Sequence, residues 1–303
     1  MSIVEKAISK RRAQAAAGAP SQSAVRMPQP EIPVPESESL TAGAASQMPD
    51  GTGGPKAQIE VDIARLRSIE AIAPEYADAR ITDEFRRIKW PLLRPLLALE
   101  PSDGFGSGRE IMVTSSVPEE GKTFVTLNLA LSIAHEKDCT VLLVDADVAK
   151  PKLTRTFEAQ DRRGLTDLLV DKSLDLYDVI LKTSIEGLWF LPAGYSNPLA
   201  PELLASHRLK DIMQQIAARD PRRVILFDSP PLLATNEAQA LGQHIRNVLM
   251  VIRAESTAPA LVAEALAALG EGKQVSCILN RAPRNLSNSY YGSYYNYGQN
   301  NKT

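Results

Sequence analysis

The chain has 303 residues, of which 34 are basic and 36 are acidic, giving a formal net charge of -2. This length suits one large α/β domain with extensions, and the balanced charge predicts no general attraction to nucleic acid or to anionic membranes. No apolar run approaches the roughly 18 residues of a membrane helix, and residues 1–12 lack the apolar core of a secretory signal. A cytoplasmic protein is therefore expected, with Cys139 and Cys277 reduced.

The first 58 residues read as a short helix followed by a linker. Apolar residues at helical spacing over residues 1–8 are compatible with a docking helix, and a frayed start is the favoured alternative. From residue 13 to about residue 58 the chain is rich in Pro, Ala, Ser, Gly and Gln, a composition that predicts disorder. Helical spacing returns from Ile59 to about Leu99, where Phe85 and Ile88 share one face of a charged helix.

Residues 105–285 alternate short apolar runs with amphipathic stretches. The apolar runs are Ile111–Val113, Val141–Val144, Leu188–Leu191, Val224–Phe227, Val248–Ile252 and Val275–Leu279. The helical stretches include Thr123–His135, Pro201–Ala217 and Ala258–Leu269. Apolar strands that alternate with helices predict an α/β fold, a mostly parallel sheet with helices on both faces. In such a sheet the ligand site lies beyond the carboxyl ends of the strands.

A phosphate-binding loop follows the first of these runs. The segment Ser116-Val117-Pro118-Glu119-Glu120-Gly121-Lys122-Thr123 fits the P-loop pattern from its last glycine onward, although Ser116 stands at the position of the first glycine. Lys122 is expected to reach the β- and γ-phosphates of ATP, and Thr123 to bind Mg²⁺ through its hydroxyl. The residues predicted to contact the nucleotide here are Ser116, Glu120, Gly121, Lys122, Thr123 and Phe124.

Acidic residues follow two other strands of the predicted sheet. The run Val141–Val144 leads into Asp145-Ala146-Asp147, and the run Val224–Phe227 leads into Asp228. Because the carboxyl ends of parallel strands meet at one edge, these carboxylates should lie beside the phosphate loop. One can serve Mg²⁺ and another can accept a proton. Loop and carboxylates together predict a P-loop ATPase.

The end of the chain, residues 286–303, is called the tail below. It holds five of the eight tyrosines, which are Tyr290, Tyr291, Tyr294, Tyr295 and Tyr297. The interleaved Gly, Ser, Asn and Gln residues predict a disordered segment. One interpretation is an adhesive low-complexity tail. The other, favoured beside a P-loop ATPase site, is a mobile phosphorylation substrate.

These segments together resemble the bacterial tyrosine kinases of capsule and exopolysaccharide synthesis, which look like partition ATPases. The similar motifs are a Walker A loop at Ser116–Thr123, a second Walker-like motif at Val141–Asp147 followed by Lys150-Pro151, and a Walker B motif at Val224–Pro231. The similarity extends to Gly164–Leu169, Leu191–Gly194 and Glu202–Leu204. The segments Met1–Ala7 and Phe85–Leu93 look most like the exosortase-associated autokinases.

The resemblance implies roles for individual residues. Lys122, Asp145 and Asp147 would be catalytic, with Asp145 as the base near the tyrosine hydroxyl, although the roles of the two aspartates could be exchanged. Thr123, Asp147 and Asp228 would bind Mg²⁺. Asn280 and Arg281 resemble the residues that contact adenine in related ATPases. The oligomerisation helix of the family carries Glu-x-x-Arg-x-x-Arg, and the matching positions here are Asp83, Arg86 and Lys89.

The resemblance also implies an activity and partners. The expected activity is ATP-dependent phosphorylation of the five tail tyrosines, regulating exopolysaccharide polymerisation or export. The expected partners are a transmembrane chain-length determinant (a polysaccharide co-polymerase), a phosphotyrosine phosphatase and further copies of the chain, with no nucleic acid. The protein would then associate peripherally with the inner membrane through its partner. The implied division is a helix and linker over 1–58, an oligomerisation segment over 59–104, a kinase domain over 105–285 and the tail.

One departure from the family pattern supports an alternative function. The family loop commonly reads Pro-Gly-Glu-Gly-Lys, whereas Glu119 here replaces the first of these glycines. A degenerate kinase that binds nucleotide and acts as a regulatory scaffold is therefore one alternative. A partition-type ATPase switch is another, but that class usually carries a second lysine early in its loop, where this chain has Val117.

Overall fold

The computed structural model describes residues 55–69, 71, 79–98, 108–220 and 222–283. They belong to one compact unit that begins at Gly51. The predicted N-terminal helix, most of the predicted linker and all five tail tyrosines lie outside these residues. Within them, no helix is both long enough and apolar enough to cross a membrane.

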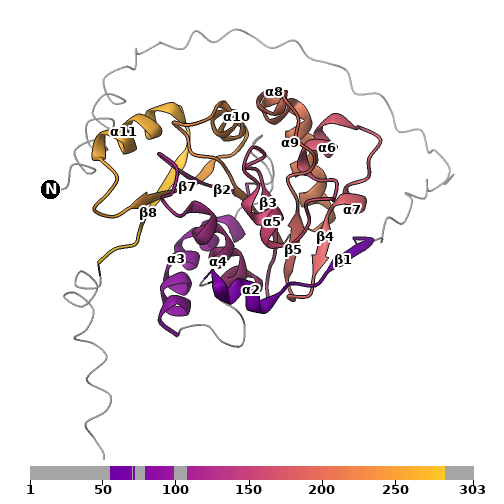
Figure 1. Ribbon diagram of the computed structural model, residues 1–303, viewed down its shortest axis with the longest axis horizontal. Coiled ribbons are helices and arrows are strands. Elements are labelled where there is room, and N and C mark those ends of the chain that lie inside the picture. The colour runs from indigo at the N-terminus through magenta and orange to yellow at the C-terminus, as the bar shows by residue number, and fades with distance from the viewer. Residues whose placement is uncertain (1–54, 70, 72–78, 99–107, 221, 284–303) are drawn as a thin grey trace, which may run out of the picture. The chain divides into compact units, whose positions relative to one another are not determined.

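A central sheet carries the fold, as predicted (Figure 1). Within the described residues it has eight strands in the spatial order β1-β4-β5-β3-β6-β2-β7-β8. Every neighbouring pair is parallel except β4 and β5. The strands are β1 (Ala57–Ile59), β2 (Glu110–Ser115), β3 (Thr140–Asp145), β4 (Leu181–Thr183), β5 (Leu188–Leu191), β6 (Arg223–Asp228), β7 (Asn247–Arg253) and β8 (Gln274–Asn280).

Helices cover both faces of this sheet (Figure 1). On one face, α2 (Ile63–Ser68), α3 (Ala79–Leu97) and α4 (Lys122–Ala134) pack against alternate strand residues such as Val141 and Leu143. Strand residues that point to the other face, such as Leu142 and Val144, belong to a second apolar core. The remaining helices are α5 (Lys152–Thr156), α6 (Leu165–Val170), α7 (Leu176–Val179), α8 (Ala200–Ala205), α9 (His207–Arg219), α10 (Asn236–His244) and α11 (Pro259–Ala268).

All six predicted apolar runs lie within strands, because strands in a sheet that is buried on both faces are continuously apolar. The structure adds two short strands, β1 and β4, whose three residues each give no periodic signal. The predicted helix Pro201–Ala217 is broken at Ser206, which is extended and donates its hydroxyl hydrogen bond to the carbonyl of Leu203. Such local side-chain bonds compete with the helix ladder.

The predicted oligomerisation segment over 59–104 is not separate from the kinase domain. Strand β1 joins the sheet through β4, so the predicted boundary at residue 58 falls inside a strand. The buried Leu66 of α2 and the buried Phe85, Leu93 and Leu96 of α3 belong to the same core as the strands. Helices α2 and α3 therefore complete one face of the domain.

Candidate active site

The phosphate loop lies between β2 and α4, at the carboxyl edge of the sheet. Gly121 caps the start of α4 with φ 92°, a left-handed conformation that favours glycine. A Cβ added to Gly121 would also lie 2.0 Å from Nδ2 of Asn280, which passes directly beside the loop. Glu119 is left-handed as well, with φ 68°, although it carries a side chain. The loop therefore adopts a left-handed turn at Glu119, although this backbone conformation is strained for any residue except glycine.

Glu120 braces this loop from behind. Its buried carboxylate accepts a hydrogen bond from the backbone N–H of Val117 at 2.8 Å, within the loop. The same side chain accepts bonds from the backbone N–H of Arg253, the last residue of β7, and from the hydroxyl of Thr257, which follows β7. Its carbonyl accepts from Nδ2 of Asn280 at 2.8 Å. Glu120 thus joins the ends of β2, β7 and β8.

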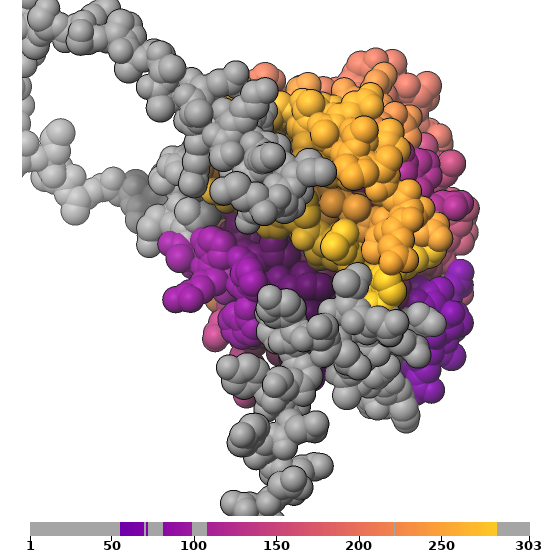
Figure 2. All heavy atoms as spheres, turned by 90° about the vertical axis from the view of Figure 1, so that its left-hand side faces the viewer, coloured from indigo at the N-terminus to yellow at the C-terminus, as the bar shows by residue number. Residues whose placement is uncertain are grey.

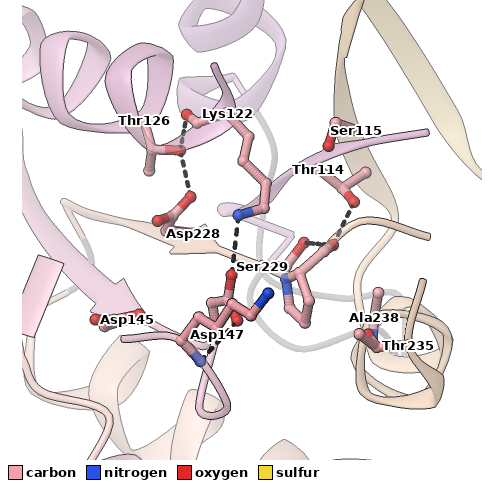
Figure 3. Close-up of polar contacts among 12 residues, drawn as sticks. Thr114, Ser115, Lys122, Thr126, Asp145, Asp147, Asp228, Ser229, Thr235 and Ala238 are labelled. Atoms are coloured by element: carbon pink, nitrogen blue, oxygen red, sulfur yellow. Dashed lines mark hydrogen bonds and ion pairs between the residues drawn. The ribbon is translucent and has the colours of Figure 1, made fainter. Parts of the chain in front are cut away.

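Lys122 and Asp147 form a buried ion pair at the centre of the site (Figure 3). The lysine Nζ lies 2.9 Å from Oδ2 of Asp147, and their side chains are 10% and 8% exposed. Lys122 starts α4, whereas Asp147 follows β3, so the pair spans the gap between loop and sheet edge. An exchange of this partner for a phosphate oxygen would leave the lysine charge paired.

Asp145 and Asp228 end the neighbouring strands β3 and β6, and they are register partners. Both are fully buried. Burial, and after it the charge of Asp228, raise the pKa of Asp145 to about 8, although hydrogen bonds from Thr154 oppose the shift. Burial likewise raises the pKa of Asp228 to about 6, opposed by the charge of Lys122. Because Asp145 and Asp228 are neighbours and both are excluded from water, their carboxylates favour a shared proton or a bound cation.

The donor chemistry of the site fits a hard divalent cation. Within the described part of the chain, one oxygen each of Asp145 (Oδ1) and Asp228 (Oδ2) is buried without a hydrogen-bond partner. The other oxygen of Asp228 accepts a bond from the Thr126 hydroxyl at 3.1 Å. The Thr123 hydroxyl lies close enough to lower the pKa of Asp228. Carboxylate and hydroxyl oxygens beside a phosphate-binding loop are the ligands that Mg²⁺ prefers.

A cavity of about 870 Å³ opens between α3 and β8, next to the loop. Figure 2 shows this face, with α3 in purple beside the yellow end of the domain. Gly121, Phe124, Asn280 and Arg281 line the cavity, so the predicted nucleoside-binding residues share one wall. The contact of Asn280 with the loop leaves its side-chain amide tied to the backbone, and the residue positions the loop as much as it faces the cavity.

Two of the predicted site residues point elsewhere. Ser116 is buried, with its hydroxyl directed at the sulfur of Met250, so only its backbone is available to the loop. Lys89 was predicted to contact a second subunit, and the structure contradicts this. Its amine is buried, donates to the carbonyl of Ser132 at 2.8 Å and pairs with Glu136 on the same chain. The apolar surroundings of α3 draw the lysine stem inward onto α4.

The other two predicted contacts of that helix do face solvent. Asp83 and Arg86 form an exposed ion pair at 3.1 Å on α3.

Three threonines that hold the site were not predicted from the sequence. Thr126 bonds Asp228, Thr154 gives Asp145 two hydrogen bonds of 2.8 Å, and Thr257 bonds Glu120. Only Thr126 had a signal, because it lies one helical turn after Lys122.

The fold and the site together define a P-loop nucleotide-binding protein of the α/β class. No protein-family model matches the chain. Tyrosine-protein kinase YwqD of Bacillus subtilis is 31% identical over 195 residues, 63% of this chain and 81% of YwqD. Tyrosine-protein kinase Etk of Escherichia coli is 32% identical over 143 residues, 47% of this chain and 19% of Etk. The crystal structure of the VpsO kinase domain superimposes with a TM-score of 0.55 at 30% identity, covering 67% of this chain and 96% of that one.

The chain belongs to the family of bacterial tyrosine-protein kinases. The resemblance and the fold predicted from the sequence are confirmed by these comparisons. The exosortase-associated subtype and the roles of the individual site residues stay predictions.

Proposed function

We propose that the protein is an ATP- and Mg²⁺-dependent tyrosine autokinase that phosphorylates the tyrosines of its own tail. One observation carries this proposal beyond family membership. The lysine of the phosphate loop pairs with Asp147, and Asp145 and Asp228 end neighbouring strands at the same carboxyl edge of the sheet, where a P-loop enzyme transfers phosphate. Tyr290, Tyr291, Tyr294, Tyr295 and Tyr297 are the proposed acceptors.

The ion pair between Lys122 and Asp147 suits a resting state. When nucleotide binds, Lys122 would exchange Asp147 for phosphate oxygens and stabilise the charge that develops on the transferred group. Asp147, Asp228 and Thr123 would hold Mg²⁺, which supplies positive charge to the phosphate oxygens when bound. The freed Asp147 carboxylate is thereby available where the cation is needed.

Transfer to tyrosine breaks the bond between the γ-phosphorus and the bridging oxygen and forms one to the phenol oxygen. The phenol proton must leave at the same time, and Asp145 is the proposed acceptor. A carboxylate with a pKa near the working pH is suited to this task, and burial gives Asp145 such a pKa, about 8. Its Oδ2 is fixed by Thr154, which leaves Oδ1 for the proton.

The partners follow from the family. We propose that the kinase works in capsule or exopolysaccharide synthesis with a transmembrane chain-length determinant, which would bring it to the inner membrane, and that a phosphotyrosine phosphatase resets it. The exposed Asp83 and Arg86 of α3 are the proposed contacts between copies. The scaffold alternative has less support, because the loop adopts its left-handed turn in spite of Glu119.

The test is an incubation of the purified full chain with ATP and Mg²⁺, followed by detection with an anti-phosphotyrosine antibody. Labelling is expected in the wild type and should fall at least about 100-fold in Lys122→Met, a loss of a few kcal/mol of transition-state stabilisation. Lys210→Met, on the distant helix α9, is the matched control and should label normally. Near-normal labelling of Lys122→Met would contradict the assigned site.

A further inference from the structure

Tyr195 is an exposed aromatic residue that is nevertheless fixed at both ends. Its side chain lies in the loop between β5 and α8, and the residue is 53% exposed. Its backbone N–H donates to Oδ2 of Asp167 at 3.2 Å, and its carbonyl accepts from the Thr166 hydroxyl at 2.7 Å. Its own hydroxyl donates to the carbonyl of Asp161 at 3.2 Å. The ring therefore faces solvent in one orientation.

The turn that carries this ring is built from closely packed backbone. Gly194 has φ 85°, and a Cβ there would lie 2.4 Å from Oδ2 of Asp167. A Cβ on Gly164 would lie 2.2 Å from the carbonyl oxygen of Pro192. The N–H of Gly164 also donates to Asp167, at 2.8 Å. Both glycines thus fix the loop against α6, and nothing in the core accounts for the outward ring.

The turn lies directly behind the proposed catalytic base. The backbone N–H of Ala193 donates to the hydroxyl of Thr154 at 3.0 Å, and that hydroxyl donates to Asp145 at 2.8 Å. Only Gly194 separates Ala193 from Tyr195, so the backbone N of Tyr195 lies at most about 13 Å from the Asp145 carboxylate. Strand β5 borders β3 on the side away from the phosphate loop after β2. An acceptor that approaches the γ-phosphate from opposite the loop comes from this side.

We propose that Tyr195 is a docking platform for the tail. In this inference, which rests on the proposed kinase function, one tail aromatic ring packs against Tyr195 while a second tail tyrosine occupies the acceptor position beside Asp145. The tail from Ser287 to Gln299 carries no charged side chain, so aromatic contacts, hydrogen bonds and backbone contacts are what it offers. A rigid exposed tyrosine suits such a contact, because little conformational entropy is lost.

The spacing of the tail tyrosines matches this geometry. Tyr290 and Tyr294 are four residues apart, as are Tyr291 and Tyr295. In an extended chain such residues lie on one face, about 13–14 Å apart, which is comparable to the upper limit of about 13 Å derived above for the distance from the Tyr195 backbone to the Asp145 carboxylate. The tail can also reach the platform. Tyr294 follows Pro283, the last described residue, by up to about 40 Å of extended chain. The five strand spacings from β8 to β5 amount to about 24 Å.

The experiment measures KM and kcat of the full chain for synthetic peptides of residues 286–303. Each peptide has Tyr294 as its single acceptor and Phe at the other tyrosine positions. One variant peptide has Ala at position 290, and its matched control has Ala at position 291, on the opposite face. A second set, with Tyr290 as acceptor and Phe or Ala at position 294, covers the opposite chain direction.

With the wild-type enzyme, Ala in place of the ring four residues from the acceptor should raise KM by about 5-fold in at least one set, with kcat unchanged. The control peptide should behave like the parent. Tyr195→Ala should raise KM for the parent peptide by a similar factor. For this variant, KM should be the same for peptides with Phe or Ala four residues from the acceptor. Tyr195→Phe, which keeps the ring and loses the hydroxyl, should retain the discrimination. Val170→Ala, another exposed apolar position, should change nothing.

Discrimination that survives in Tyr195→Ala, or its absence from both sets in the wild type, would overturn the platform. So would a wild-type enzyme that labels its own tail but none of the peptides. A wild type that labels neither its tail nor any peptide would instead contradict the proposed kinase function. Unfolding temperatures of the Tyr195 variants, measured in parallel, separate a loss of docking from a loss of folded protein.

Discussion

Replacement of Lys89 by methionine separates an internal contact from a subunit contact. The Lys89 side chain is 4% exposed and pairs with Glu136, whose side chain is 25% exposed, at 2.5 Å. Methionine keeps the apolar stem but removes the charge and the bond to the Ser132 carbonyl. Loss of a fully buried ion-pair partner costs about 3–5 kcal/mol, and the partial exposure of Glu136 reduces the expected loss to about 2–4 kcal/mol.

For a domain of this size that loss corresponds to an unfolding temperature lower by about 4–15 °C. The assay is thermal unfolding followed by circular dichroism, at a protein concentration where light scattering finds only monomers. Arg86→Met is the matched control, because its pair with Asp83 is exposed and contributes little, about 0–0.5 kcal/mol. It should melt within about 2 °C of the wild type. A Lys89→Met monomer that melts with the wild type would refute the internal role.

Three further predictions concern the site and the tail. Glu119→Gly should relieve the left-handed strain and stabilise the fold by about 1 kcal/mol, and because it also removes a carboxylate near the phosphates, calorimetry should find ATP bound more tightly. Unchanged stability together with unchanged or weaker ATP binding would show that the loop accommodates Glu119 without cost. The raised pKa of Asp145, about 8 and caused mainly by burial, contributes stability that is full below the pKa of an unfolded aspartate and is lost as pH rises to about 8. The unfolding temperature of nucleotide-free protein in chelator should therefore fall less for Asp145→Asn than for wild type between pH 5.5 and 8.5, and parallel curves would contradict this. When Lys122→Met chains with intact tails are mixed with active chains whose tail tyrosines are Phe, phosphotyrosine should appear on the inactive chains; an unlabelled inactive chain beside a self-labelling wild type would mean transfer within one chain.

The sequence predicted the parts of the fold that rest on periodicity. Strands such as Val141–Val144 and Val224–Phe227 are continuous apolar runs, and a sheet buried on both faces requires them. The acids that follow these strands converge for the same reason, because parallel strands end at one edge. Short strands escaped prediction. β1 and β4 owe their pairing to tertiary contacts and have too few residues for a pattern.

The rest of the site could not be predicted because it depends on contacts between segments that lie far apart in the sequence. Lys89 matches a charged helical position, and only the packing of α3 onto α4 shows that its amine is turned inward. Thr154 and Thr257 are ordinary polar residues until the fold brings them to Asp145 and Glu120. The left-handed turn at Glu119 could be anticipated, since the motif requires it, whereas the bracing of Glu120 by the ends of β7 and β8 could not.

The site is proposed to transfer phosphate from ATP to the tail. The most direct measurement is intact-protein mass spectrometry of the wild type after incubation with ATP and Mg²⁺, with tandem mapping of the modified residues. We expect stepwise phosphate additions confined to Tyr290, Tyr291, Tyr294, Tyr295 and Tyr297. Neither Lys122→Met nor a chain with Phe at these five positions should gain phosphate there. Nucleotide binding and hydrolysis without any phosphate on tyrosine would contradict the claim and identify a scaffold or a switch.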